Sequence, residues 1–301
     1  MAARFWALVL AARLLVAAAV AAGAGAILRL SIVAATVAGV TVWSVVSLAA
    51  VAASFAAARS GAHSPRIRTG PMWLLRIVCA EALALDMTLV RMAADPLLER
   101  VDRLAGPGSH PPARVVLVHG IACNRAVWRP LLAALRFAGI EGVHAVNLEP
   151  LFADIDTHAR NLLARLEAIG ASPARPVAIV AHSMGGLVAR AALREAKSGM
   201  IGRIITVGTP HHGTAIACRF RWPSTRQMCC GSPWLLELNA RQEARPGLPV
   251  TSLHSLDDNL IVPAGSAVLP GARSIELRGL GHLSLLCSPD VLRRIVAELR
   301  A

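Results

Sequence analysis

Two long apolar stretches open the chain. From Leu30 to Ala58 the sequence contains no charged residue, and this run is longer than the roughly 20 residues that a helix needs to cross a bilayer core. Residues 5–27 are also apolar, but they include Arg13 and a Gly-Ala-Gly-Ala interruption at 23–26. The pattern predicts that residues 1–59 form a membrane anchor of one or two transmembrane helices.

Three arrangements of this anchor remain open. The two stretches could form a helical hairpin, residues 21–26 could end a cleaved signal peptide, or residues 1–29 could lie flat while the second stretch spans. Four arginines follow the second stretch, at 59, 66, 68 and 76, and basic flanks favour the cytoplasmic side of a membrane. The hairpin and the signal peptide then place the rest of the chain in the cytoplasm, whereas the flat arrangement places it outside. We expect an inner-membrane protein of a bacterium with its catalytic domain in the cytoplasm.

Residues 60–111 connect the anchor to the rest of the chain. Residues 60–71 are rich in turn-forming residues and read as a linker. Residues 72–103 have the apolar periodicity of an amphipathic helix, with Glu81 and Asp86 on its polar side. A second linker, rich in Gly and Pro, begins at Gly106.

Residues 112–301 alternate between short apolar runs and amphipathic stretches, which predicts a doubly wound α/β fold with a mostly parallel sheet. An insertion at about 214–247 contains Trp222 and Trp234, and its Ser232-Pro233 sequence suits the start of a helix. It could be a mobile lid over a substrate or a fixed cap. The expected strands are 115–118, 143–148, 177–181, 204–207, 250–253 and 274–277, and the expected helices are 125–137, 156–169, 185–197 and 289–299.

Charge and cysteine content narrow the functional classes. The formal net charge is +13 and Tyr is absent, but no basic run is interleaved with aromatic residues, so we expect no nucleic-acid partner. The six cysteines show no metal-binding spacing. We expect reduced thiols, although Cys218 could form a bridge with Cys229 or Cys230 if the domain were exported.

The sequence Val-Ala-Ile-Val-Ala-His-Ser-Met-Gly-Gly at 177–186 has the form of a nucleophile elbow: an apolar strand, a tight turn that presents Ser183, and a helix. The small residues Ala181 and Gly185 allow strand and helix to cross closely. The alternative is a buried serine in an ordinary strand-to-helix turn. The elbow is favoured because residues that could activate the serine follow downstream.

A serine hydroxyl needs a positioned base to act as a nucleophile at neutral pH. Candidate acids, Asp257 and Asp258, follow the strand at 250–253, and His282 follows the strand at 274–277. This is the order Ser, acid, His. We prefer Asp258 as the acid because it directly precedes Asn-Leu-Ile-Val-Pro, and Asp257 remains the alternative.

An oxyanion needs two N–H donors. The backbone of Met184, directly after the nucleophile, supplies one candidate, and Ile121 in the His-Gly-Ile-Ala loop at 119–122 supplies the other. His211 and His212 have no carboxylate or cysteine at ligand spacing. We therefore expect neither a metal nor a cofactor.

With these residues in place, residues 112–300 resemble the α/β-hydrolase superfamily, on the side of bacterial triacylglycerol lipases and esterases. The likeness rests on Val-His-Gly-Ile, Ala-His-Ser-Met-Gly-Gly, Val-Gly-Thr-Pro-His-His-Gly, Gly-Ser-Pro-Trp-Leu-Leu-Glu-Leu-Asn and Asp-Asn-Leu-Ile-Val-Pro before Gly-His. It implies a triad of Ser183, Asp258 and His282, and an oxyanion hole of Ile121 and Met184.

The resulting hypothesis is a membrane-anchored serine hydrolase that cleaves carboxylic esters, of lipids above all, through an acyl-enzyme. The expected partners are a lipid or acyl-ester substrate and the bilayer. An acyltransferase or thioesterase with the same triad is the near alternative. A non-enzymatic membrane scaffold that uses the hydrolase fold is the distant one.

Overall fold

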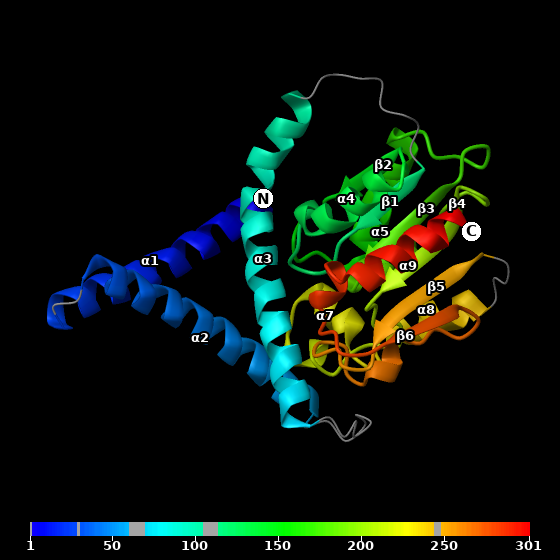
Figure 1. Ribbon diagram of the computed structural model, residues 1–301. Coiled ribbons are helices and arrows are strands. Elements are labelled where there is room, and N and C mark those ends of the chain that lie inside the picture. Colours follow the sequence, from blue (N-terminus) through cyan, green and yellow to red (C-terminus); the bar gives the residue numbers. More distant parts are fainter. Residues whose placement is uncertain (1, 29–30, 60–69, 105–113, 244–247) are drawn as a thin grey trace.

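The computed structural model describes residues 2–28, 31–59, 70–104, 114–243 and 248–301. The predicted linkers fall mostly on residues 60–69 and 105–113, which lie outside the described residues. Three long helices come first: α1 (Ala2–Leu28), α2 (Ile32–Arg59) and α3 (Pro71–Leu104). Figure 1 shows α1 and α2 converging away from the domain, with α3 between them and the sheet.

Two helical segments, Ala2–Ile27 and Ile32–Arg59, are long and apolar enough to cross a membrane by length and composition. They pack through small residues, because a Cβ added at Gly39 would lie 2.7 Å from the carbonyl oxygen of Ala17. Arg13, the charge in the middle of the first of them, pairs with Asp86 of α3 at 3.3 Å and lies over the ring of Trp43 of α2. The charge within an apolar helix is thus neutralised between helices rather than exposed.

The remaining chain forms one sheet in which all six described strands are parallel, in the order β2-β1-β3-β4-β5-β6. This confirms the predicted α/β architecture. The strands are β1 (Val115–Val118), β2 (Val143–Val146), β3 (Val177–His182), β4 (Ile201–Val207), β5 (Val250–Ser255) and β6 (Arg273–Leu277).

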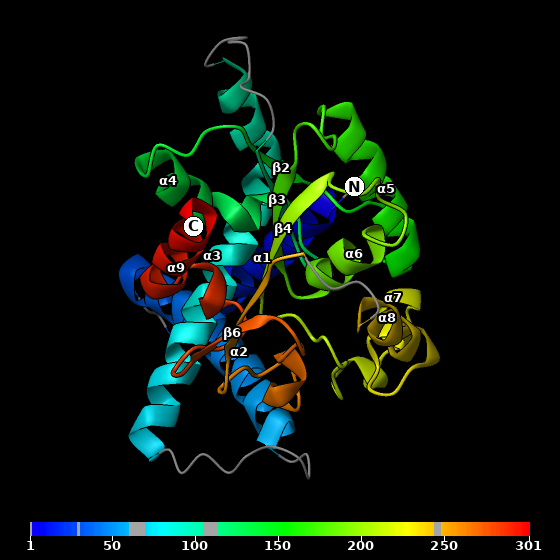
Figure 2. The ribbon, with the colours of Figure 1, turned by 90° about the vertical axis from the view of Figure 1, so that its right-hand side faces the viewer.

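Helices cover both faces of the sheet, as strands buried on both faces require. Helices α5 and α6 lie on one side and α4 and α9 on the other (Figure 2). The predicted helix at 125–137 is divided into a 3₁₀ turn, Arg125–Trp128, and α4, because Pro130 begins a new helix at its first turn. The four helices are α4 (Arg129–Phe137), α5 (Ile155–Ala168), α6 (Met184–Ala192) and α9 (Pro289–Arg300).

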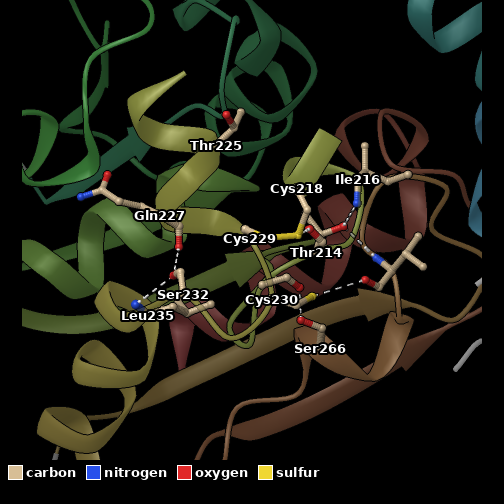
Figure 3. The surroundings of a disulfide bond; sticks show 12 residues. Thr214, Ile216, Cys218, Thr225, Gln227, Cys229, Cys230, Ser232, Leu235 and Ser266 are labelled. Atoms are coloured by element: carbon tan, nitrogen blue, oxygen red, sulfur yellow. Dashed lines mark hydrogen bonds between the residues drawn. A yellow bond between two sulfur atoms is a disulfide. The ribbon is translucent and has the colours of Figure 1, made fainter. Parts of the chain in front are cut away.

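The insertion after β4 forms two helices, α7 (Pro223–Met228) and α8 (Pro233–Glu243). The predicted start of α8 is confirmed, since the Ser232 hydroxyl accepts the N–H of Leu235. Cys218 and Cys229 form a disulfide beside these helices (Figure 3). The expectation of reduced thiols was therefore wrong at these two positions: the turn into α7 brings their Cα atoms to 4.6 Å, within the range of a disulfide.

Candidate active site

Ser183 lies at the turn between β3 and α6 in a backbone conformation that side chains rarely adopt, with φ 55° and ψ −129°. The turn is held on both sides. The Ser183 N–H donates to the Val207 carbonyl at 2.9 Å, and the Thr209 hydroxyl donates to the Ser183 carbonyl at 2.9 Å. A Cβ at Gly185 would lie 2.5 Å from the Val118 carbonyl oxygen, so only glycine fits there. Such a strained, over-determined turn is typical of a functional site.

The loop after β1 lies directly against this turn. A Cβ added at Gly120 would come within 2.8 Å of the Ser183 Cβ, and Ala122 has a positive φ of 55°. Burial lowers the pKa of His119 to about 4, so its ring is neutral. In that form its Nε2 accepts the Leu148 N–H at 3.0 Å and fixes the loop. Gly120, which directly precedes Ile121, thus lies against the serine, while Met184 is the first residue of α6.

His282 and Asp258 are joined directly. The imidazole Nδ1 lies 2.8 Å from Asp258 Oδ2, and both side chains are almost fully buried. The other carboxylate oxygen accepts the N–H groups of Leu260 and Ile261, at 2.8 and 2.9 Å. Burial disfavours the charged imidazole, but the carboxylates of Asp258 and Glu81 together outweigh it, so the pKa of His282 is raised above its ordinary value.

Ser183 and the His282–Asp258 pair lie close together at the carboxyl ends of β3, β5 and β6. A Cβ on Gly208, the residue after the acceptor of the Ser183 N–H, would lie 3.3 Å from Asp258 Oδ2 and 3.4 Å from His282 Nδ1. His182, the neighbour of the serine, has its ring centroid 4.6 Å from that of His282. The three chain segments that carry the predicted residues thus converge.

Asp257, the alternative acid, is engaged elsewhere. Its Oδ2 accepts the Gly279 N–H at 2.7 Å, which holds the start of the loop that leads to His282. Among the described residues, no group of three or more His, Cys, Asp or Glu side chains is placed to hold a metal ion.

The N-terminal helices contact three loops of the site, the loop after β1, the loop of Asp258 and the loop of His282; the sequence patterns did not indicate these contacts. The Trp6 indole of α1 donates to the Ala122 carbonyl at 2.7 Å, next to Ile121. The amide of Asn259, next to Asp258, donates to the Ser54 hydroxyl of α2 at 2.7 Å. Glu81 of α3 is buried against the loop that carries His282. The one available signal was that Glu81 is the first carboxylate of the chain, within an otherwise apolar run.

The insertion is fastened to the helices beneath it. Asp156 of α5 accepts the Trp234 indole N–H at 2.7 Å and the Gln227 amide at 3.0 Å, and pairs with Arg194. The side-chain oxygen of Asn239 in α8 accepts from the guanidinium of Arg190 at 2.7 Å. These contacts favour the fixed cap over the mobile lid.

Residues 115–251 match the model of the alpha/beta hydrolase family. Together with the parallel sheet and the strained serine turn, this match shows the alpha/beta hydrolase fold, and the resemblance stated from the sequence is confirmed. No curated protein matches the sequence.

Solved structures show the same fold at low sequence identity. The mature lipase BlEst2 of Bacillus licheniformis is 19% identical, with a TM-score of 0.57 over 64% of this chain and 96% of that chain. Lipase B of Aspergillus fumigatus is also 19% identical, with a TM-score of 0.56 over 65% of this chain and 55% of its own. Phospholipase PlaB of Legionella pneumophila is 14% identical, with a TM-score of 0.54 over 64% and 60%.

Proposed function

We propose that this α/β hydrolase is a membrane-anchored serine hydrolase that cleaves carboxylic esters of lipids. The observation that carries the proposal is the buried His282–Asp258 pair beside the strained turn of Ser183. The order and roles of these groups are those of the serine, histidine and acid triad. The lipases and the phospholipase that share the fold support a lipid ester as substrate.

In the proposed mechanism the Ser183 hydroxyl attacks the ester carbonyl while His282 Nε2 takes its proton. Asp258 keeps the proton on Nδ1 and stabilises the imidazolium. The N–H groups of Ile121 and Met184 donate to the tetrahedral oxyanion. The imidazolium then protonates the leaving alcohol, and water activated by His282 resolves the acyl-enzyme and regenerates Ser183.

The helix contacts support a bilayer substrate. The first turns of α1 and the last turns of α2 both contact the catalytic domain. Trp6 of α1 binds the oxyanion loop, and Ser54 of α2 binds the loop that carries Asp258. A hairpin across the bilayer would hold the site at the membrane surface, where the ester bonds of lipids lie. Cleavage of a signal peptide at 21–26 would remove the Trp6 contact and leave that of Ser54, so we favour the hairpin among the three arrangements.

Two features bear on the side of the membrane that the domain occupies. The arginines after α2 favour the cytoplasm, which remains our proposal, whereas the Cys218–Cys229 disulfide is typical of an oxidising compartment. Membrane-impermeant maleimide applied to intact cells decides between them, because Cys79 and Cys230 are free and exposed. Protection of both thiols until lysis supports the cytoplasm, and labelling in intact cells rejects it.

The activity is tested with the full-length protein in detergent and a series of p-nitrophenyl esters of increasing acyl length. We expect turnover without added metal or cofactor, with longer chains preferred once they can reach the apolar helices. Adding an alcohol acceptor separates the alternatives: a hydrolase releases free acid, and an acyltransferase transfers most of the acyl group to the alcohol. Absence of turnover on every ester and thioester would reject the enzyme and leave the scaffold.

A further inference from the structure

The carboxylate of Glu81 accepts hydrogen bonds from the loop that carries His282. The side chain lies on α3, and only 1% of the residue is exposed. Its Oε1 accepts the Leu283 N–H at 2.7 Å, and its Oε2 accepts the Ser284 N–H at 2.9 Å and the Ser284 hydroxyl at 2.6 Å. All three donors thus come from the two residues that follow the histidine.

The hydrogen-bond donors around Glu81 show which chemical form of its side chain fits the site. Backbone N–H groups can only donate, and one faces each oxygen of Glu81, so both oxygens must accept. A carboxylate meets this demand, whereas the amide of glutamine would turn an NH₂ group toward one of the two N–H groups. Burial raises the pKa of Glu81, while hydrogen bonds from Ser284 and Leu283 oppose that rise.

Close contacts hold the backbone of the histidine loop at residues 281–284. A Cβ at Gly281 would overlap the carboxyl group of Glu81, so loop and helix touch through a glycine. The His282 N–H donates to Asn259 Oδ1 at 2.9 Å. Three consecutive N–H groups, from His282 to Ser284, therefore end on side-chain oxygens from two separate parts of the chain.

We propose that Glu81 is a positioning residue for the reaction: it fixes residues 281–284 so that the His282 ring stays on Asp258 and faces Ser183. The inference rests on the proposed function for its kinetic consequences. It makes α3 a part of the active site rather than a connector between the anchor and the hydrolase domain. The geometry assigns a role to a carboxylate outside the segment that matches the family model, at 115–251.

Charges around the imidazole set the expected pH effect. The carboxylates of Asp258 and Glu81 both favour the imidazolium. The neighbouring His182 is itself held neutral, because burial first, and then the charge of His282, lower its pKa well below the ordinary value. The Glu81 carboxylate interacts electrostatically with His282 and with the Cys287 thiol. The guanidinium of Arg91 also acts on the Cys287 thiol. Removal of the Glu81 charge leaves one carboxylate instead of two, so the pKa of His282 should fall.

The test compares Glu81→Gln, Glu81→Asp and the control Glu167→Gln, an exposed carboxylate of α5, in the full-length protein. For Glu81→Gln we expect kcat to fall about 10²-fold with little change in KM, the loss typical of a misplaced catalytic group. The acid limb of kcat/KM should move to lower pH by about half a unit or more, since an opposite charge is lost. Glu81→Asp keeps the charge and should retain the limb while lowering kcat. Glu167→Gln should match the wild type.

A titration of the His282 ring by NMR gives a readout that does not need turnover. The inference predicts a lower pKa and a less protected Nδ1 proton in Glu81→Gln than in the wild type. If the wild type hydrolyses no ester, the proposed function fails but this comparison still decides the role of Glu81. An unchanged limb and an unchanged titration in Glu81→Gln, with any loss explained by a smaller folded fraction, would overturn the inference. If Glu81→Gln does not fold, an unaltered kcat in Glu81→Asp would overturn the inference instead.

Discussion

Replacing Asp258 by asparagine is expected to lower kcat/KM for an ester by about 10⁴-fold, as loss of the acid does in a serine triad. The asparagine oxygen can still accept the N–H groups of Leu260 and Ile261, so the loop keeps its support. The new NH₂ group would instead donate to His282 Nδ1, now 2.8 Å from a carboxylate oxygen. The ring proton then moves to Nε2, which leaves no lone pair to accept the Ser183 proton.

The neighbouring aspartate provides the matched control. Asp257 accepts one backbone N–H, from Gly279, and the asparagine oxygen can still accept it. Even complete loss of that bond would cost about 1 kcal/mol, or roughly fivefold in rate if all of it reaches the transition state. Steady-state kinetics of Asp257→Asn and Asp258→Asn should therefore differ by about three orders of magnitude. Equal effects, or a larger loss at 257, would show that the acid has been assigned to the wrong residue.

Replacing Ser183 by glycine is expected to abolish turnover and to stabilise the protein. The side chain sits at φ 55° and ψ −129°, a conformation that costs of order 1–3 kcal/mol for residues other than glycine. Turnover should fall by on the order of 10⁶-fold, as when a triad serine is removed. The free energy of unfolding should rise by about 1 kcal/mol, because glycine relieves part of the strain.

Ser183→Ala separates the two effects. Alanine removes the hydroxyl but keeps a Cβ in the strained conformation, so turnover should be lost without the gain in stability. Thermal unfolding followed by circular dichroism, alongside ester hydrolysis, measures both quantities. A glycine variant no more stable than the alanine variant would mean that the turn stores no strain, and residual turnover near that of the wild type would remove Ser183 from the mechanism.

The fold was predictable because its signals are local. Parallel strands buried on both faces read as continuous apolar runs, and residues 115–118 and 177–181 are such runs. The helices between them carry a strong 3.6-residue period, so the order of elements and the sheet edge that gathers their loops followed directly. Strand β4 begins at Ile201, earlier than the expected residue 204, because its first residues pair with β3 across an irregular register.

The contacts of the N-terminal helices could not be predicted in this way. An amphipathic pattern shows that a helix has a polar side, but not what that side faces. Asp86 turns toward Arg13 and Ser47 of the apolar helices, whereas Glu81 turns toward the histidine loop, about two hundred residues away in the chain. The Cys218–Cys229 disulfide depended in the same way on a turn whose geometry no spacing rule supplies.

The central claim is that Ser183 is a nucleophile activated by His282. The most direct test treats the folded full-length protein with a fluorophosphonate and locates the adduct by mass spectrometry. The account predicts a single adduct on the peptide that contains Ser183, formed faster as the pH rises through the raised pKa of His282 and much more slowly in Asp258→Asn. An unmodified Ser183 in folded protein, or an adduct on another residue, would contradict it.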